Sequence, residues 1–177
     1  MTQEPVFMAH SKPLSQAADQ DKRVQEYELK ASFLFNFAKY TIWPSHTFRD
    51  PKSPIILGIV GKDPFGEILD KAFANKKIGR RPILIKRFGR AKRVPFAHMI
   101  FFGKLAPKVE SSLQKKLALR ATLSIADRPG VAGKGTSAGF YMDRGKVRFE
   151  ISKRAVEGSH LNMSSQLLKL AKLVDKQ

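Results

Sequence analysis

Residues 55–73 read IILGIVGKDPFGEILDKAF and contain the two patterns that decide the fold class. The first six residues form an uninterrupted apolar run between Pro54 and Gly61, which is typical of a β-strand covered on both faces. Apolar residues at helical spacing follow, with Asp63 as the expected N-cap and Pro64 at the favoured first position of the helix. This strand-then-helix unit predicts an α/β protein.

Similar signals extend outward from this unit. Residues 82–85, 99–102 and 122–125 are short apolar runs that predict strands, and we expect the first two to be internal strands of the sheet. A glycine-rich loop over residues 130–139 leads into a predicted hairpin, which turns at residues 143–146. Parallel strands joined by helices, together with this hairpin, predict a mixed sheet.

Three helices complete the predicted architecture. The first occupies residues 26–43 and ends at Pro44, and the second occupies residues 108–119. Ser164 or Ser165 is expected to cap a third helix, in which a C-terminal set of apolar residues shares one face: Leu167, Leu170, Ala171 and Val174. We therefore predict an α/β three-layer sandwich, in which a mixed β-sheet has helices on both faces.

The chain length of 177 residues fits one domain. Residues 1–23 have no sustained apolar period and predict a flexible N-terminal tail, so the folded domain is expected over residues 24–177. The first twenty residues are polar and contain no apolar core of a secretory signal, which by itself favours a cytosolic protein.

The chain is strongly basic, with 33 Lys and Arg against 15 Asp and Glu and a net charge of +18. Such a balance attracts nucleic acid, acidic lipid headgroups or acidic proteins, although it can also serve only to keep the surface soluble. Half of residues 76–93 are Lys or Arg and none is acidic. We expect these charges on the loops that flank the strand at 82–85, as a solvated or membrane-proximal rim.

No catalytic or metal-binding pattern is present in the sequence. The absence of cysteine excludes disulfides, thiolate metal sites and cysteine nucleophiles, and the four histidines stand far apart. Residues 61–66 lie where a phosphate-binding loop could occur but lack the Lys-Ser/Thr pair that such a loop needs, so we interpret them as a structural turn. We predict no enzyme activity, no metal and no cofactor.

Several segments together resemble the YfiR family of bacterial periplasmic regulators: residues 27–44 (YELKASFLFNFAKYTIWP), residues 59–69, residues 99–103 and residues 123–172. The resemblance implies a non-enzymatic, exported α/β domain. It would bind the periplasmic part of an inner-membrane diguanylate cyclase and repress it, which lowers cyclic di-GMP and biofilm matrix. Related domains occur on sensor kinases, so the expected partner is a cyclase or a sensor kinase, and a homodimer is possible.

Two side chains on the second hairpin strand are candidate ligand contacts. Strand alternation directs Val147, Phe149 and Ile151 toward the core, which sends Arg148 and Glu150 to the opposite face. There they can meet a ligand, or they can form a structural ion pair or remain solvated.

The partner-binding residues are expected among aromatic and long aliphatic side chains, which carry most of the energy in protein interfaces. We predict Leu161, Met163 and Trp43 as such contacts, with a core position as the other interpretation of Trp43. A basic nucleic-acid-associated protein is the alternative function, and salt-dependent retention on DNA would favour it.

Overall fold

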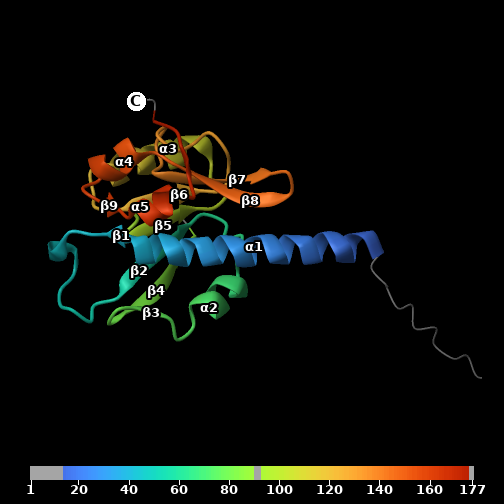
Figure 1. Cartoon of the computed structure of the whole chain (residues 1–177), viewed down its shortest axis with the longest axis horizontal. Helices are drawn as coiled ribbons and strands as arrows, with labels where there is room; N and C mark the ends of the chain where they lie inside the picture. Colours follow the sequence, from blue (N-terminus) through green and yellow to red (C-terminus); the bar gives the residue numbers. More distant parts are fainter. Residues whose placement is uncertain (1–13, 90–92, 176–177) are drawn as a thin grey trace, which may run out of the picture.

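The computed structural model describes residues 14–89 and 93–175. Its helices are α1 (Leu14–Tyr40), the 3-10 turn η1 (Ser45–Thr47), α2 (Glu67–Phe73), α3 (Pro107–Leu117), α4 (Lys153–Gly158) and α5 (Ser165–Leu168). Its strands are β1 (Thr41–Ile42), β2 (Ile55–Val60), β3 (Lys77–Ile78), β4 (Arg81–Phe88), β5 (Met99–Phe102), β6 (Leu123–Ala126), β7 (Ala138–Asp143), β8 (Lys146–Ile151), β9 (Asn162–Met163) and β10 (Lys172–Leu173). Figure 1 shows their arrangement.

The main sheet has eight strands in the order β10-β8-β7-β6-β5-β2-β4-β3. The central strand β2 pairs in parallel with β4 on one side and with β5 on the other, and β5, β6 and β7 continue the parallel part. The predicted hairpin is confirmed as the antiparallel pair β7 and β8, and β3 pairs antiparallel with β4. The predicted mixed sheet is therefore confirmed.

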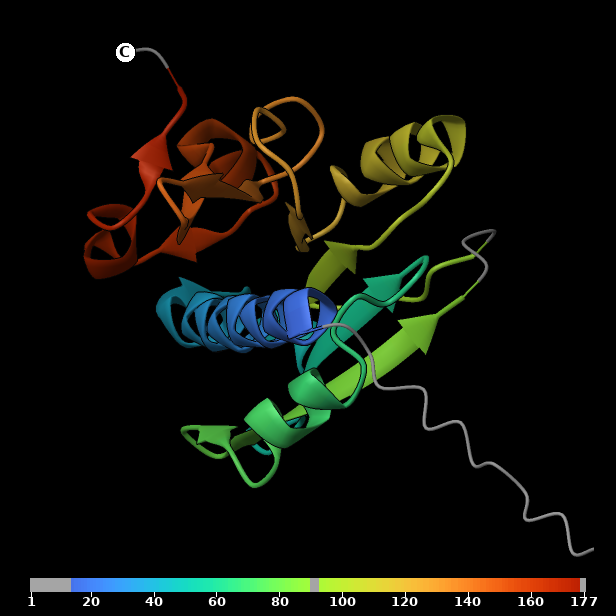
Figure 2. The same ribbon diagram turned by 90° about the vertical axis from the view of Figure 1, so that its right-hand side faces the viewer.

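Helices cover both faces of this sheet. On β5, Met99 and Phe101 belong to a core cluster that includes α1 and α2, whereas Ile100 and Phe102 pack with Leu113 of α3. Figure 2 accordingly shows α1 (blue) on one side of the central strands and α3 (olive) on the other. Each large apolar side chain buried in this way stabilises the fold by roughly 1.5–3 kcal/mol.

The first helix is longer than predicted. It begins at Leu14 and ends at Tyr40, before Pro44, and the part from Leu14 to Arg23 is helical where a tail was expected. That part has no periodic apolar pattern, because every one of its residues is exposed. Residues 1–13 of the predicted tail lie outside the described residues. Figure 1 shows the amino-terminal half of α1 extending beyond the rest of the domain.

Strand β4 is internal in the strand order, between β2 and the edge strand β3, but it is less covered than β5. Its side away from β2 pairs only at Arg81 and Pro82, with the short strand β3, so the sheet nearly ends there. The expectation that the basic residues avoid this strand is wrong, because Lys86 and Arg87 lie within it. Residues 90–92 of the basic run lie outside the described residues.

The start of helix α2 differs from the prediction, whereas the start of α5 agrees with it. Helix α2 starts at Glu67 rather than at Pro64, because the Asp63 carboxylate accepts the Phe65 N–H at 2.8 Å in a turn and binds Arg87. Ser164 does cap α5, as one of the two predicted caps.

The C-terminal segment does not continue as the helix predicted beyond Leu168. Instead, β10 adds to the sheet beside β8, and the Val174 N–H donates to the Ile151 carbonyl at 3.1 Å. Pairing with the sheet gives the backbone of this segment its hydrogen bonds, so Leu170 is exposed and shares no helical face with Val174.

Candidate functional site

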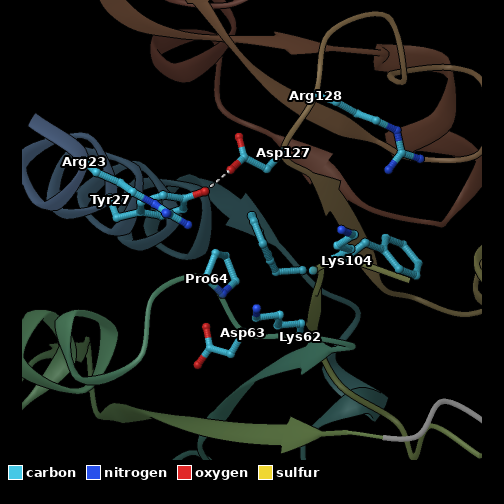
Figure 3. Close-up of a pocket in the computed structure, with 11 residues that line it drawn as sticks. Arg23, Tyr27, Lys62, Asp63, Pro64, Lys104, Asp127 and Arg128 are labelled. Atoms are coloured by element: carbon cyan, nitrogen blue, oxygen red, sulfur yellow. Dashed lines mark hydrogen bonds between the residues drawn. The ribbon is translucent and has the colours of Figure 1, made fainter. Parts of the chain in front are cut away.

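A cleft lies at the carboxyl ends of β2, β5 and β6, between these strands and α1. The chain leaves β2 toward β4 on one side, whereas β5 lies on the other side of β2, so this edge is a topological switch point. Open α/β sheets bind ligands in the crevice at such a point. The cavity has a volume of about 460 Å³, which is in the range of small-molecule sites. Figure 3 shows its lining residues.

Two lysines are fixed side by side by the packing of the loops that follow β2 and β5. The Lys62 N–H donates to the Lys104 carbonyl at 3.2 Å, and the Gly103 N–H donates to the Val60 carbonyl at 2.8 Å. A Cβ atom on Gly103 would lie 2.1 Å from the Lys62 carbonyl oxygen, and Gly61 has a φ of +85° with the Lys104 carbonyl 2.7 Å from its Cβ position. Only glycine permits this approach at either position.

The cavity wall next to α1 contains Asp127, whose carboxylate is paired with side chains of that helix. Asp127 follows β6, and its carboxylate accepts the Tyr27 hydroxyl at 2.8 Å and the Lys30 ammonium at 2.7 Å. The buried Lys30 also binds Glu26 one helical turn earlier. Burial and the hydrogen bond to Asp127 raise the pKa of the Tyr27 hydroxyl, so Tyr27 remains a protonated donor. The Asp127 charge is therefore balanced from within the helix.

Asp63 and Arg128 line the cleft as well, and each forms an ion pair with a residue outside it. Asp63 receives Arg87 from β4 at 2.6 Å, and Arg87 reaches on to Asp70 of α2 at 2.7 Å. Arg128 pairs with the buried Glu110 of α3, and Figure 3 shows its guanidinium directed away from Asp127.

The cleft consequently carries an excess of positive charge. Three of its basic side chains have no carboxylate within ion-pair distance in the described part of the chain: Arg23, Lys62 and Lys104. Unbalanced cations around a partly enclosed cavity raise the local concentration of anions. The arrangement is suited to holding an anion.

The sequence analysis missed this cleft because its residues come from α1 and from three separate loops. One signal could have found it, because Gly61, Gly103 and Asp127 each follow an apolar strand directly. Carboxyl ends of parallel strands meet at one edge of a sheet, so residues at those positions are neighbours.

The chain matches one known protein family over most of its length. The sequence profile of the family described as YfiR/HmsC-like matches residues 27–172, which include strands β1 to β9 and both cleft lysines. The chain belongs to the YfiR/HmsC-like family. YfiR-type proteins regulate diguanylate cyclases and are generally non-catalytic. A comparison with curated protein sequences finds none that matches this chain.

In this YfiR/HmsC-like chain, two of the three predicted partner contacts lie in the core. Leu161 is 1% exposed and Trp43 is 7% exposed, and the Trp43 indole N–H donates to the His98 carbonyl at 3.0 Å. Side chains enclosed in this way have no surface to offer a partner, so this expectation is wrong for both. Met163 is half-buried and pairs with Thr41 in the small β1–β9 sheet.

The two predicted ligand contacts on β8 have different surroundings. Glu150 is buried, and its carboxylate accepts the backbone N–H groups of Val131 at 2.8 Å and Ala132 at 3.1 Å. It thereby anchors the glycine-rich loop and forms no ion pair with Arg148 among the described residues. Arg148 lies two residues earlier on β8 and is exposed.

Arg148 lines a second depression, which we call the hairpin groove. Its walls are one stripe of α1 and the β7–β8 hairpin, and its volume is about 600 Å³. The apolar contribution comes largely from Leu29, which is 44% exposed, and Met142, which is 48% exposed. Two partly exposed aliphatic side chains that face one groove are a candidate contact surface for a protein.

Two other classes of site have no candidate among the described residues. No helix there has the length and apolar character that crossing a bilayer requires. No group of three or more His, Asp or Glu side chains in the same ranges is arranged to hold a metal ion.

Proposed function

We propose that this chain acts in the periplasm, where it binds the periplasmic part of an inner-membrane diguanylate cyclase and holds the enzyme inactive. The observation that carries the proposal is the family match over residues 27–172. Repression of the cyclase lowers cyclic di-GMP and, with it, biofilm matrix. The periplasmic part of a sensor kinase is the other partner that the family resemblance implies.

The hairpin groove is the surface that we assign to this partner. Leu29 and Met142 are each about half exposed, so covering them removes apolar area from water without unfolding the domain. Lys22 borders the same groove and can pair with acidic residues at the rim of an interface. The exposed amino-terminal part of α1 adjoins the groove and extends the available surface (Figure 1).

The charge of +18 supports a second feature of the interaction. A basic protein is drawn to the anionic surface of a membrane and to an acidic partner, which raises the rate of association. Neutralising Lys76, Lys77, Arg80 and Arg81 is expected to slow association, with an effect that shrinks as salt rises, because exposed charges are screened beyond about 8–10 Å.

Deleting the gene in its host and measuring cyclic di-GMP tests the proposal. Loss of the repressor should raise cyclic di-GMP, and the wild-type gene should restore the original level. A double variant, Leu29→Asp with Met142→Asp, should be exported at the wild-type level but fail to restore it. Leu119→Asp is the matched control, because Leu119 is 88% exposed and lies outside the groove.

Two results would contradict the proposal. The first is a deletion strain with unchanged cyclic di-GMP, and the second is recovery of the protein from the cytoplasm on DNA, with retention that falls as salt rises. The second result would support the alternative of a nucleic-acid-associated protein.

A further inference from the structure

We propose that the cleft at the carboxyl ends of β2, β5 and β6 binds a small organic molecule through a phosphate group, held by Lys62 and Lys104. This inference does not depend on the cyclase proposal, because it concerns a different face of α1 from the hairpin groove.

The positions of the two lysines carry the first step. Their backbones are hydrogen-bonded to each other. Gly61 and Gly103 allow the two loops to approach more closely than any other residue would permit. Two ammonium groups carried on neighbouring backbones repel each other. A doubly charged anion between them replaces that repulsion with two attractions, and lysine is a common phosphate ligand as a point charge.

The surrounding carboxylates carry the second step, because they do not neutralise the lysines. Asp127 is balanced by Lys30 and by the Tyr27 hydroxyl, and Asp63 is bound by Arg87. The cleft therefore keeps its positive charge for a ligand. Arg23, which lines the same cavity from α1, adds a third cation with five donors.

The size and lining of the cavity indicate what the ligand carries besides its phosphate group. A volume of about 460 Å³ exceeds what a phosphate ion fills. Phe101, Phe102 and Pro64 provide apolar contact, and the remaining lone pairs of Asp127 can accept a hydroxyl or amine of the ligand. The ligand class is a small phosphorylated molecule with a polar body.

Calorimetric titration of the full chain with inorganic pyrophosphate, at low ionic strength, tests the site. Saturable binding with one equivalent is expected for the wild type. The double variant Lys62→Gln/Lys104→Gln should bind about tenfold or more weakly. The control Lys115→Gln/Lys116→Gln removes the same charge from exposed positions on α3 and should bind as the wild type does.

Equal weakening by both double variants would show that pyrophosphate responds only to net charge, and the proposal would be overturned. Absence of saturable binding to the wild type would overturn it as well. A second titration uses vesicles of phosphatidylglycerol in place of pyrophosphate. Dependence on Lys62 and Lys104 in the vesicle titration alone would assign these lysines to a membrane surface instead of a soluble ligand.

Discussion

The two ends of the parallel strands of this protein have opposite characters. At the amino ends, His98 is enclosed by aromatic rings, with Phe48 stacked on it at 4.4 Å and Trp43 edge-on at 5.8 Å, and its Nδ1 accepts the Ile56 N–H at 3.0 Å. At the carboxyl ends, Lys62 and Lys104 border an open cavity and make no ion pair among the described residues.

This difference separates stability from binding within one sheet. At the aromatic end, defined by Trp43, Phe48, Phe96 and His98, the Trp43 indole and the His98 Nδ1 have hydrogen-bond partners within the domain. The buried His98 Nε2 has none among the described residues. The cleft end leaves charge uncompensated, which costs stability and provides affinity for an anion. Substitutions at the aromatic end should therefore reduce stability, and substitutions of the cleft lysines should reduce binding.

The largest expected effect is at the aromatic end and the adjoining core. Trp43→Ala and Leu161→Ala each leave a cavity, and each should lower the free energy of unfolding by about 2–5 kcal/mol. Urea denaturation would measure this. The pyrophosphate affinity of the folded fraction should stay unchanged. A variant that keeps its stability but loses affinity would contradict the assignment of stability to the aromatic end and binding to the cleft.

The pH dependence of stability should come next in size. Burial lowers the pKa of His98 to about 4, because protonation would place a charge among the aromatic rings and break the bond from Ile56. An unfolded histidine protonates near pH 6.5, so the stabilisation is complete above that pH and is lost as the pH falls toward 4. The loss amounts to roughly 3 kcal/mol.

Denaturation curves across this pH range check the size of the effect. His98→Gln keeps an acceptor near the Ile56 N–H but does not titrate, so its curve should be flatter than that of the wild type. A His98→Gln curve parallel to the wild-type curve would assign the acid sensitivity to other groups.

A third substitution lies on the boundary between helix and cleft. Lys30→Met removes one partner of Asp127 and should lower the free energy of unfolding by about 2 kcal/mol, since the buried pair is broken. It also leaves the negative charge of Asp127 without its lysine partner, so this charge should repel pyrophosphate and weaken its binding. Lys71→Met breaks only the exposed pair with Glu67 and should change neither quantity measurably.

The smallest effect should come from removing residues 1–22. The described part of that stretch, residues 14–22, is helical and exposed, so its loss should change the free energy of unfolding by less than about 1 kcal/mol. Thermal unfolding of the truncated chain measures this. A larger fall would show that the amino-terminal part of α1 is stabilised by contacts with the domain.

Sequence reasoning worked where burial follows a regular period. Strands β2 and β5, helix α3 and the β7–β8 hairpin each have a clear apolar pattern. It failed where tertiary contacts decide the outcome. Asp63 has the residue type of an N-cap but binds Arg87, and the segment at Lys172 pairs with β8 instead of continuing a helix.

The candidate site was less predictable than the fold, because its parts are far apart in the sequence. Lys62, Lys104 and Asp127 become neighbours only through the strand order of the sheet. The apolar character of Leu161 and Trp43 was visible, but sequence alone did not tell a core position from a surface one. Their burial moves the proposed partner surface to Leu29 and Met142.

The most direct test of the proposed regulation measures cyclic di-GMP synthesis by host membranes that carry the cyclase, with the purified chain added to the periplasmic face. The wild type should lower the rate of synthesis in proportion to the amount bound. The Leu29→Asp/Met142→Asp variant should leave the rate unchanged, and Leu119→Asp should repress as the wild type does. An undiminished rate with the wild type, or equal repression by the groove variant, would contradict the account.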